Sequence, residues 1–206
     1  MAAALFSTLP LVACTDLDVT NINEPDSERA RTNPGDVGSL IEASYNNWFQ
    51  ASHAWSPGFF LSAETFQHGP PYTNWGMEYF SRIPRVATIT DATHSFYPPM
   101  SWGWEWNYKA ISALASGLKA LENPEMVQAL GQEQVILYRA YGRFVQGLAH
   151  ASVAMLYARG FVLDETTDLE QPQELVDYPT LVEKALAYFD EAIAIAASSS
   201  FEIDFD

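Results

Sequence analysis

The chain has 206 residues, of which 48% are hydrophobic, and it is long enough for one domain with a substantial core. Ten Lys and Arg residues stand against 26 Asp and Glu residues, and the net charge of −16 argues against nucleic acid or anionic lipid as a partner. Aromatic residues make up 14% of the chain. Core packing explains some of them, and a binding surface can account for the others.

The N-terminus has the pattern of a secreted lipoprotein. Residues 2–13 form an uncharged apolar run that is shorter than the roughly 20 residues of a membrane span and suits a secretory signal. Small and apolar residues then precede Cys14, as in a bacterial lipobox, where the thiol takes a diacylglycerol. We therefore expect residues 1–13 to be a signal peptide and Cys14 to be the lipidation site. The absence of Lys and Arg before the run departs from the usual signal, and the alternative is a buried core cysteine.

Residues 14–35 are polar and rich in turn residues, and we interpret them as a lipidated tether with an extended lead-in. A helix is predicted to begin near Asp36, because apolar residues then recur at helical spacing. These are Val37, Leu40, Ile41, Tyr45 and Trp48. Residues 51–101 follow no period and contain six prolines, but their many aromatic residues argue against disorder. Long irregular segments of this kind are usually functional.

From about residue 102 the pattern is helical. One helix is predicted to end near Asn123, which caps the next helix with Pro124 at its first position. That next helix is predicted over 125–158, with an interruption near Gly131. In its second half the apolar residues fall on one side and the polar residues on another. The apolar side is Tyr141, Phe144, Val145, Leu148, Ser152 and Met155; the polar side is Arg139, Arg143, Gln146 and His150.

Because His150 lies on the polar side of this helix, we interpret it as a solvent-exposed histidine. The adjacent acidic pairs 164–165 and 190–191 are likewise interpreted as solvated charge at a helix end or on an outer face. The four histidines have no metal-ligand spacing, and the chain has no arrangement of residues typical of a hydrolase or a nucleotide-binding enzyme. We expect no catalytic residues, no metal and no cofactor.

The last helix is predicted to begin at Thr180 with a capping box to Glu183. Its predicted buried face is Val182, Ala185, Leu186, Phe189, Ile193 and Ala196. Residues 201–205 alternate like a strand without a partner. Small residues recur at the spacing of tetratricopeptide helices in 113–120 and 185–192, where they let two helices approach closely. The sequence thus predicts an all-α fold of tetratricopeptide-like helical hairpins with a long irregular, aromatic-rich segment.

Several segments, in the right order along the chain, resemble the SusD/RagB family. Residues 14–26 resemble its lipobox and acidic lead-in, and 36–49 resemble its first helix. Residues 74–85 resemble the loop after that helix. Residues 137–165 resemble a long helix with an Arg-Ala pair and a closing Leu-Tyr-x-x-Gly, and 178–196 resemble the next helix. Members of the family are longer, so that residues 36–206 are expected to be an N-terminal helical domain, with apolar surface left uncovered along the last helix.

The resemblance implies a surface-exposed lipoprotein, attached to the outer membrane by its lipid anchor and facing outward. It also implies a partner, a TonB-dependent, SusC-like outer-membrane transporter, to which the protein delivers a bound oligosaccharide or peptide nutrient. The alternative is a tetratricopeptide-type scaffold that binds another protein and has no small-molecule ligand.

Glycan sites place aromatic faces against sugar rings and use amides and carboxylates to bind the hydroxyl groups. Two aromatic segments supply both kinds of group, at 72–75 and 102–107. The predicted ligand-binding residues are Tyr72, Asn74, Trp75, Trp102 and Trp104. The alternatives for each tryptophan are a place in the core or at the transporter interface. Because Trp102, Trp104 and Trp106 differ by roughly 200° per step on a helix, at least one of them is expected to be exposed or outside the helix.

Overall fold

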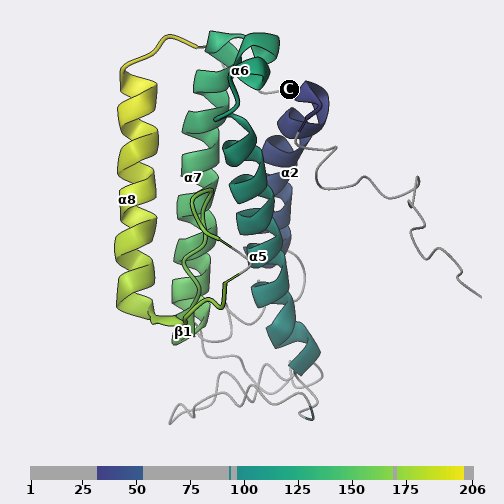
Figure 1. Ribbon diagram of the computed structural model, residues 1–206. Coiled ribbons are helices and arrows are strands. Elements are labelled where there is room, and N and C mark those ends of the chain that lie inside the picture. Colours follow the sequence, from purple (N-terminus) through teal and green to yellow (C-terminus); the bar gives the residue numbers. More distant parts are fainter. Residues whose placement is uncertain (1–31, 53–92, 94–96, 169–170, 202–206) are drawn as a thin grey trace, which may run out of the picture.

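The computed structural model describes residues 32–52, 93, 97–168 and 171–201 (Figure 1). Most of these residues are helical, which confirms the predicted all-α class. The elements in chain order are α2 (Pro34–Ser52), α5 (Tyr97–Ala120), α6 (Pro124–Leu130), α7 (Gln132–Leu156), β1 (Arg159–Gly160), β2 (Val176–Asp177) and α8 (Tyr178–Ala197). No helix within the described ranges is both long and apolar enough to cross a membrane.

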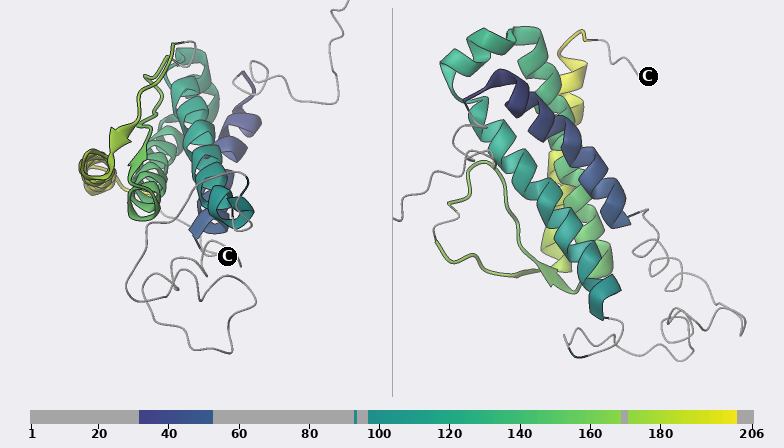
Figure 2. Two further views of the ribbon diagram at one scale, coloured as in Figure 1. Left: turned by 90° about the horizontal axis from the view of Figure 1, so that it is seen from below. Right: turned by 90° about the vertical axis from the view of Figure 1, so that its right-hand side faces the viewer.

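The four long helices α2, α5, α7 and α8 lie side by side and alternate in direction (Figures 1 and 2). Helix α7 is central, since it packs against α2, α5 and α8 and also contacts the short helix α6. Helix α8 lies at the outer edge, where its main partner is α7 and its others are the two strands. One side of α8 therefore has no neighbouring helix in the described part of the chain.

The main core lies between α2, α5 and α7. Its largest members are apolar side chains that the helical spacing places on inward faces of the three helices. They include Val37, Ile41, Leu114, Leu118, Leu121, Val135, Tyr138 and Val145, with Met126 of α6 closing one end. A second group, formed by Val153, Ala154 and Leu181, joins α7 to α8.

Glycines lie at close contacts between several helices, and two of these contacts are within the pairs α2–α5 and α7–α8. A Cβ atom at Gly117 of α5 would lie 2.5 Å from Cγ1 of Ile41 on α2, and one at Gly147 of α7 would lie 2.6 Å from the ring of Phe189 on α8. Real Cβ atoms do not come so near, so a larger residue at either position would push the helices apart. Both positions therefore fix the spacing within the pairs α2–α5 and α7–α8.

The capping residues and the glycine between α5 and α7 start and end the helices where the sequence predicted. Asn123 is the N-cap of α6, and its side chain accepts a hydrogen bond from the backbone N–H of Glu125 at 2.9 Å, with Pro124 in the first turn. Gly131 separates α6 from α7 with a φ of 85°, which a residue with a Cβ rarely adopts. Helix α5, in contrast, begins at Tyr97, before the predicted start near 102.

The segment from 157 to 177 leaves α7 and returns to α8 through a two-stranded antiparallel pairing that the sequence did not predict. This pairing sets the start of α8. The N-cap is Asp177, whose carboxylate accepts from the N–H of Thr180 at 3.2 Å and from its hydroxyl at 2.7 Å. The predicted capping box with Thr180 as N-cap is therefore wrong, because Val176 and Asp177 are held extended by β1.

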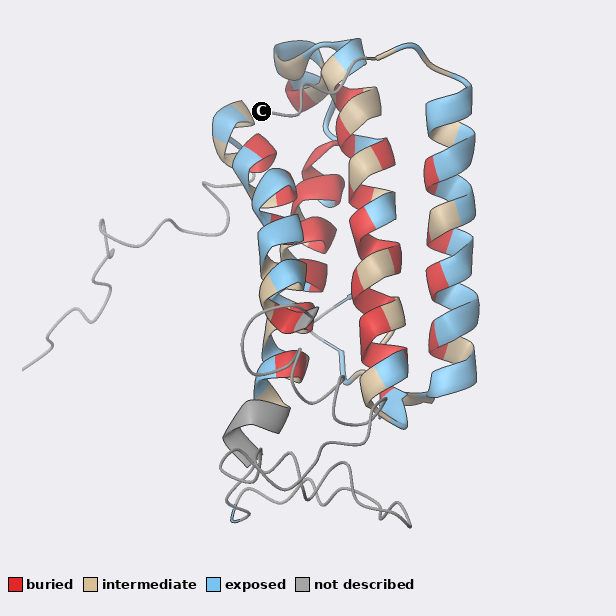
Figure 3. Cartoon of the chain, turned by 180° about the vertical axis from the view of Figure 1, so that it is seen from behind, coloured by how far each residue is buried: buried red, intermediate tan, exposed pale blue. Residues whose placement is uncertain are grey.

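The predicted buried face of α8 is also partly wrong. Leu181, Ala185, Tyr188 and Ala192 are buried, whereas Val182, Leu186 and Ile193 are exposed. On α7 the predicted apolar side likewise includes two exposed residues, Phe144 and Met155. Figure 3 shows the pattern from behind, with exposed positions on the outward sides of α7 and α8. The assignment of these residues to a buried face was wrong, whereas uncovered apolar surface along the last helix was expected, and no described element covers Val182, Leu186 and Ile193.

Several sequence-based predictions fall outside the described residues. These concern the signal peptide at 1–13, the lipidation site Cys14, most of the tether, the ligand-binding candidates Tyr72, Asn74 and Trp75, and the strand-like tail beyond Phe201. They remain predictions.

Candidate ligand-binding surface

Three tryptophans lie in the first half of α5 and point in two directions. Trp102 is 43% exposed, whereas Trp104 and Trp106 are half-buried. Because Trp102 and Trp106 are four residues apart, they lie on the same side of the helix. Trp104 lies on the opposite side. At least one tryptophan was expected to be exposed, and Trp102 is.

Trp104 belongs to an aromatic cluster at one end of the helical bundle. Its ring centroid lies 4.6 Å from that of Tyr108, 5.2 Å from that of Tyr157 and 5.9 Å from that of Phe161. Such tilted and edge-to-face contacts are favourable between aromatic rings. The Tyr108 hydroxyl accepts from the N–H of Phe161 at 2.5 Å and donates to its carbonyl at 3.1 Å, and burial raises the pKa of Tyr108 to about 12. The cluster fixes the chain after α7 against α5.

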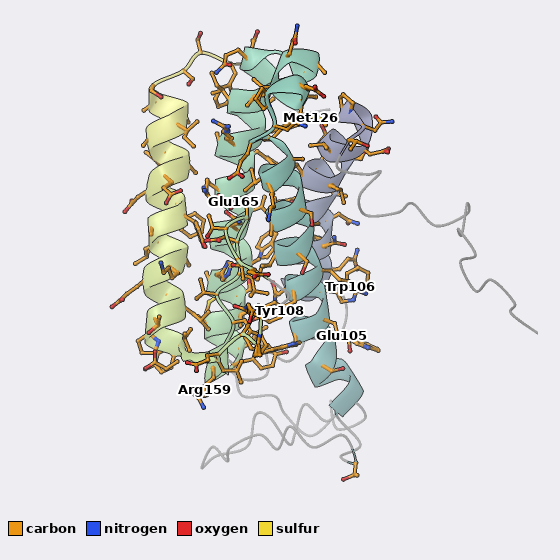
Figure 4. The ribbon with its side chains drawn as sticks, in the orientation of Figure 1. Glu105, Trp106, Tyr108, Met126, Arg159 and Glu165 are labelled. Carbon is orange, nitrogen blue, oxygen red and sulfur yellow. The ribbon has the colours of Figure 1, made fainter. Side chains whose placement is uncertain are left out.

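The opposite side of α5 carries a row of accessible groups, which we call the α5 strip: Trp102, Glu105, Trp106 and Lys109. Figure 4 shows Glu105 and Trp106 projecting from α5, away from α7 and α8. The Lys109 ammonium lies 4.1 Å from the centroid of the Trp106 ring, a cation–π contact that holds both side chains in place. The strip therefore combines aromatic surface with one anionic and one cationic hydrogen-bonding group.

Sequence reasoning named Trp102 and Trp104 as ligand-binding residues and missed that Trp106 lies on the same side of α5 as Trp102. The signal was available, because positions 102, 105, 106 and 109 share one face of any helix. Of the two named residues, Trp102 presents open surface, and Trp104 contributes an edge of the bundle-end cluster. Asn107, from the same segment, is buried and donates through Nδ2 to the carbonyl of Gly103 at 2.7 Å.

A second arrangement of polar side chains lies where α7, α8 and the 161–168 segment meet. We call it the polar cluster: Arg143, Gln146 and His150 of α7, Asp164 and Glu165 of the segment, and Tyr188 and Glu191 of α8. Figure 4 shows Glu165 beside α7 and α8.

Arg143 is the centre of the polar cluster. Its guanidinium donates to both carboxylate oxygens of Glu165, with Nη1 3.0 Å from Oε2, and its Nε lies 2.7 Å from Oε2 of Glu191. Nη1 also donates to Oε1 of Gln146 at 2.7 Å. Burial lowers the pKa of Arg143, but the two carboxylates outweigh it and the net shift is upward.

The rest of the cluster is equally well paired. The Tyr188 hydroxyl donates to Oδ2 of Asp164 at 3.1 Å, and burial raises the pKa of Tyr188. Nδ1 of His150 lies 2.8 Å from the carbonyl of Gln146, and Nε2 lies 3.4 Å from the N–H of Leu163. This arrangement fits a neutral imidazole that donates from Nδ1 and accepts at Nε2. The polar cluster thus ties the segment after α7 to the α7–α8 pair.

Two predictions about these residues are wrong. His150 is fully buried rather than solvated, and Glu165 is 9% exposed and ion-paired rather than part of an exposed acidic pair. The physical reason is the same for both. A polar stripe on α7 was assumed to face water, but α8 and the 161–168 segment cover it and supply its partners.

No group of His, Cys, Asp and Glu side chains is placed to hold a metal ion in the described part of the chain. Comparison with known protein families, with curated proteins and with solved structures found no match to this chain.

Proposed function

We propose that this chain is a surface-exposed lipoprotein of the SusD/RagB type, which binds a glycan or peptide nutrient and delivers it to a TonB-dependent outer-membrane transporter. In this proposal Cys14 carries the lipid anchor, and the transporter supplies the channel. The observation that supports ligand binding is the α5 strip, where exposed Trp102 lies on the same side of the helix as Glu105 and as half-buried Trp106, whose ring carries the Lys109 ammonium.

This combination suits a sugar better than an apolar ligand. Aromatic faces pack against the C–H faces of sugar rings, and the neighbouring carboxylate and ammonium groups accept from and donate to the hydroxyls. A net charge of −16 repels acidic ligands, which favours neutral oligosaccharides among the candidates. Trp104 lies too deep in its cluster to stack fully, so its role in this proposal is to support the end of α5.

The helical scaffold of the proposal consists of two tetratricopeptide-like pairs, α2–α5 and α7–α8. Their support is the close approach within each pair at Gly117 and at Gly147. Small residues at such crossings are typical of repeated helical pairs. The function proposed here needs such a scaffold only to hold α5 and its accessible strip in place.

The test is calorimetric titration of the chain with a panel of neutral oligosaccharides. We expect Trp102→Ala and Trp106→Ala each to weaken binding of the best ligand by about 1–3 kcal/mol, since truncating an aromatic anchor costs about that much. Tyr178→Ala is the matched control, because Tyr178 is an exposed aromatic residue at the start of α8, outside the strip. Equal binding by all three variants, with unchanged circular dichroism, would contradict a role for the strip.

A further inference from the structure

The chain leaves α7 through a segment that returns along the same helix. Residues 161–168, which we call the strap, lie over α7 between α5 and α8, as the view from below in Figure 2 shows. Leu163 contacts His150, and two residues further along the strap Glu165 contacts Arg143. Arg143 lies about two turns before His150, so the strap runs antiparallel to α7. The side chain of Leu163 packs against a buried apolar group of α5 and α7.

Side chains of the helices bind the backbone of the strap. The Tyr108 hydroxyl of α5 accepts from the N–H of Phe161 and donates to its carbonyl. Nε2 of His150 lies 3.4 Å from the N–H of Leu163 and accepts from it. Because burial raises the pKa of Tyr108 to about 12, the bonds to Phe161 do not change near neutral pH. The bond to Leu163 is different, since it depends on the protonation state of an imidazole.

This bond exists only while the imidazole of His150 is neutral. Nδ1 lies 2.8 Å from the carbonyl of Gln146 and so carries the proton, which leaves Nε2 as the acceptor. A second proton can bind only at Nε2, where it would face the N–H of Leu163, and two donors would oppose each other. His150 is also fully buried, so the added charge would lack hydration. Protonation therefore favours a form in which the imidazole reaches water.

Titratable and charged groups surround His150 and the strap on every packed element. They are Tyr108 on α5, Arg143 on α7, Asp164 and Glu165 on the strap, and Tyr188 and Glu191 on α8. Burial lowers the pKa of His150, and the carbonyl of Gln146 and the charge of Asp164 reverse only part of the shift. The closed strap thus disfavours the charged imidazole overall, as the hydrogen-bond geometry requires.

We propose that the strap is a pH-sensitive switch, in which protonation of His150 releases residues 162–168 from α7 while the long helices stay packed. The released form uncovers the side of α7 that carries Gln146 and His150. This inference is independent of glycan binding and of the transporter.

The release is local because the contacts on either side of it do not involve His150. Phe161 keeps its bonds to Tyr108, and the pairing of β1 with β2 holds the chain just before it. The main core between α2, α5 and α7 contains no residue of the strap. Val153 and Leu181 join α7 to α8 independently of it.

Hydrogen exchange of the full chain, followed at single amides by NMR at about pH 7.5 and 5.5, measures the release. Each rate is divided by the intrinsic exchange rate at that pH, so that the opening equilibrium remains. An exposed imidazole binds its proton near pH 6.5, so the opening constant at Leu163 should rise by up to about tenfold between the two pH values. Phe161 and the amides of α7 and α8 should keep their protection. Unchanged protection at Leu163, or an equal loss in the helices, would overturn the proposal.

Two variants assign the response to His150. In His150→Asn the amide still donates to the carbonyl of Gln146 but does not titrate, so the opening constant should be the same at both pH values. Tyr188→Phe removes the bond to Asp164 and should loosen the strap equally at both, leaving the ratio unchanged. Circular dichroism checks that both variants fold. A His150→Asn protein that kept the response would assign it to Glu165 or Glu191 and contradict the proposal.

The unmodified chain provides a test that needs no variant. The nitrogen resonances of the His150 ring distinguish the two neutral tautomers from the charged form. At about pH 7.5 we expect a neutral ring that carries its proton on Nδ1. A ring protonated on Nε2 at that pH could not accept from Leu163, and the switch would be ruled out.

Discussion

Arg143 on α7 and Glu165 in the segment after α7 form a two-pronged ion pair beside α8, in which both terminal nitrogens of the guanidinium donate to the carboxylate. The pair is largely shielded, since the two side chains are 20% and 9% exposed. Together with Glu191 it connects three parts of the chain at one point. Its value to stability can be measured directly.

Glu165→Gln should lower the free energy of unfolding by about 2 kcal/mol, because it leaves a mostly buried guanidinium with one carboxylate partner fewer. Urea denaturation followed by circular dichroism measures the change. Glu174→Gln is the matched control, since Glu174 is exposed in the same connecting region, and it should change stability by less than about 0.5 kcal/mol. Similar changes in the free energy of unfolding for the two substitutions would mean that the ion pair does not stabilise the fold.

His150 should make stability depend on pH. Burial lowers its pKa below the ordinary value, and the carbonyl of Gln146 and the charge of Asp164 oppose the shift without reversing it. The unfolded chain therefore takes up a proton near pH 6.5 that the folded chain does not, and stability falls as the pH decreases from about 7 to 5. The centroid of the Tyr188 ring lies 5.3 Å from that of the imidazole, and the Arg143 guanidinium lies 5.5 Å from the centroid of the same tyrosine ring.

Denaturation curves at several pH values measure this dependence. In His150→Asn the amide retains a donor for the carbonyl of Gln146 but does not titrate, so the loss of stability between pH 7 and 5 should become smaller than in the unmodified chain. Below about pH 4 both proteins should lose stability. There Asp164, whose pKa is lowered because bonds from Thr166, Tyr188 and Thr167 outweigh its burial, becomes protonated. If the free energy of unfolding fell equally between pH 7 and 5 in His150→Asn and in the unmodified chain, His150 would not be a buried neutral imidazole.

Gly147→Ala tests the close packing of α7 on α8. Alanine favours an isolated helix by about 1 kcal/mol, but its Cβ would lie 2.6 Å from the Phe189 ring, and we expect a net destabilisation of about 1–3 kcal/mol. Phe189→Leu in the same chain should recover part of the loss, because it removes the ring that Cβ meets. Gly35→Ala, where the nearest atom would be 3.4 Å away, is the control. A stabilised Gly147→Ala protein would mean that the helices are not in tight contact.

Short-range signals predicted part of the fold well. Asn123 followed by Pro124 correctly placed the start of α6, and Gly131 correctly placed the break before α7. These signals act within a few residues, so the chain contains all of the information they need. The start of α8 was missed because Asp177 and Thr180 are both good N-caps. The choice between them depends on the pairing of β1 with β2, which joins positions far apart in the sequence.

Burial was predicted less well, since helical spacing shows which residues share a side but not what that side meets. The polar stripe of α7 was assigned to water, yet α8 and the following segment bury Gln146 and His150. The apolar row of α8 was assigned to the core, yet Leu186 and Ile193 are exposed. The same holds for the candidate site, where the sequence alone did not show which tryptophans would be buried. The sequence identified the tryptophans of α5, and the packing of Trp104 against Tyr157 and Phe161 distinguishes it from Trp102.

Cys14 should carry the lipid anchor. When cells expressing the protein behind a competent signal are fed a labelled fatty-acid analogue, the protein should incorporate the label, and Cys14→Ser should abolish incorporation. A deletion of residues 1–13 that retains Cys14 should also remain unlabelled, because acylation requires export. Equal labelling of the Cys14→Ser protein would refute the assignment.

The transport role has the most direct test in the partner that it requires. The full-length protein, tagged and expressed in its own cells, is purified from detergent-solubilised outer membranes, with the Cys14→Ser protein as the unanchored control. We predict that a large TonB-dependent barrel protein is recovered in stoichiometric amount with the anchored protein and is depleted with the control. Repeated recovery of the anchored protein without any barrel protein would contradict the proposed delivery of nutrients to a transporter.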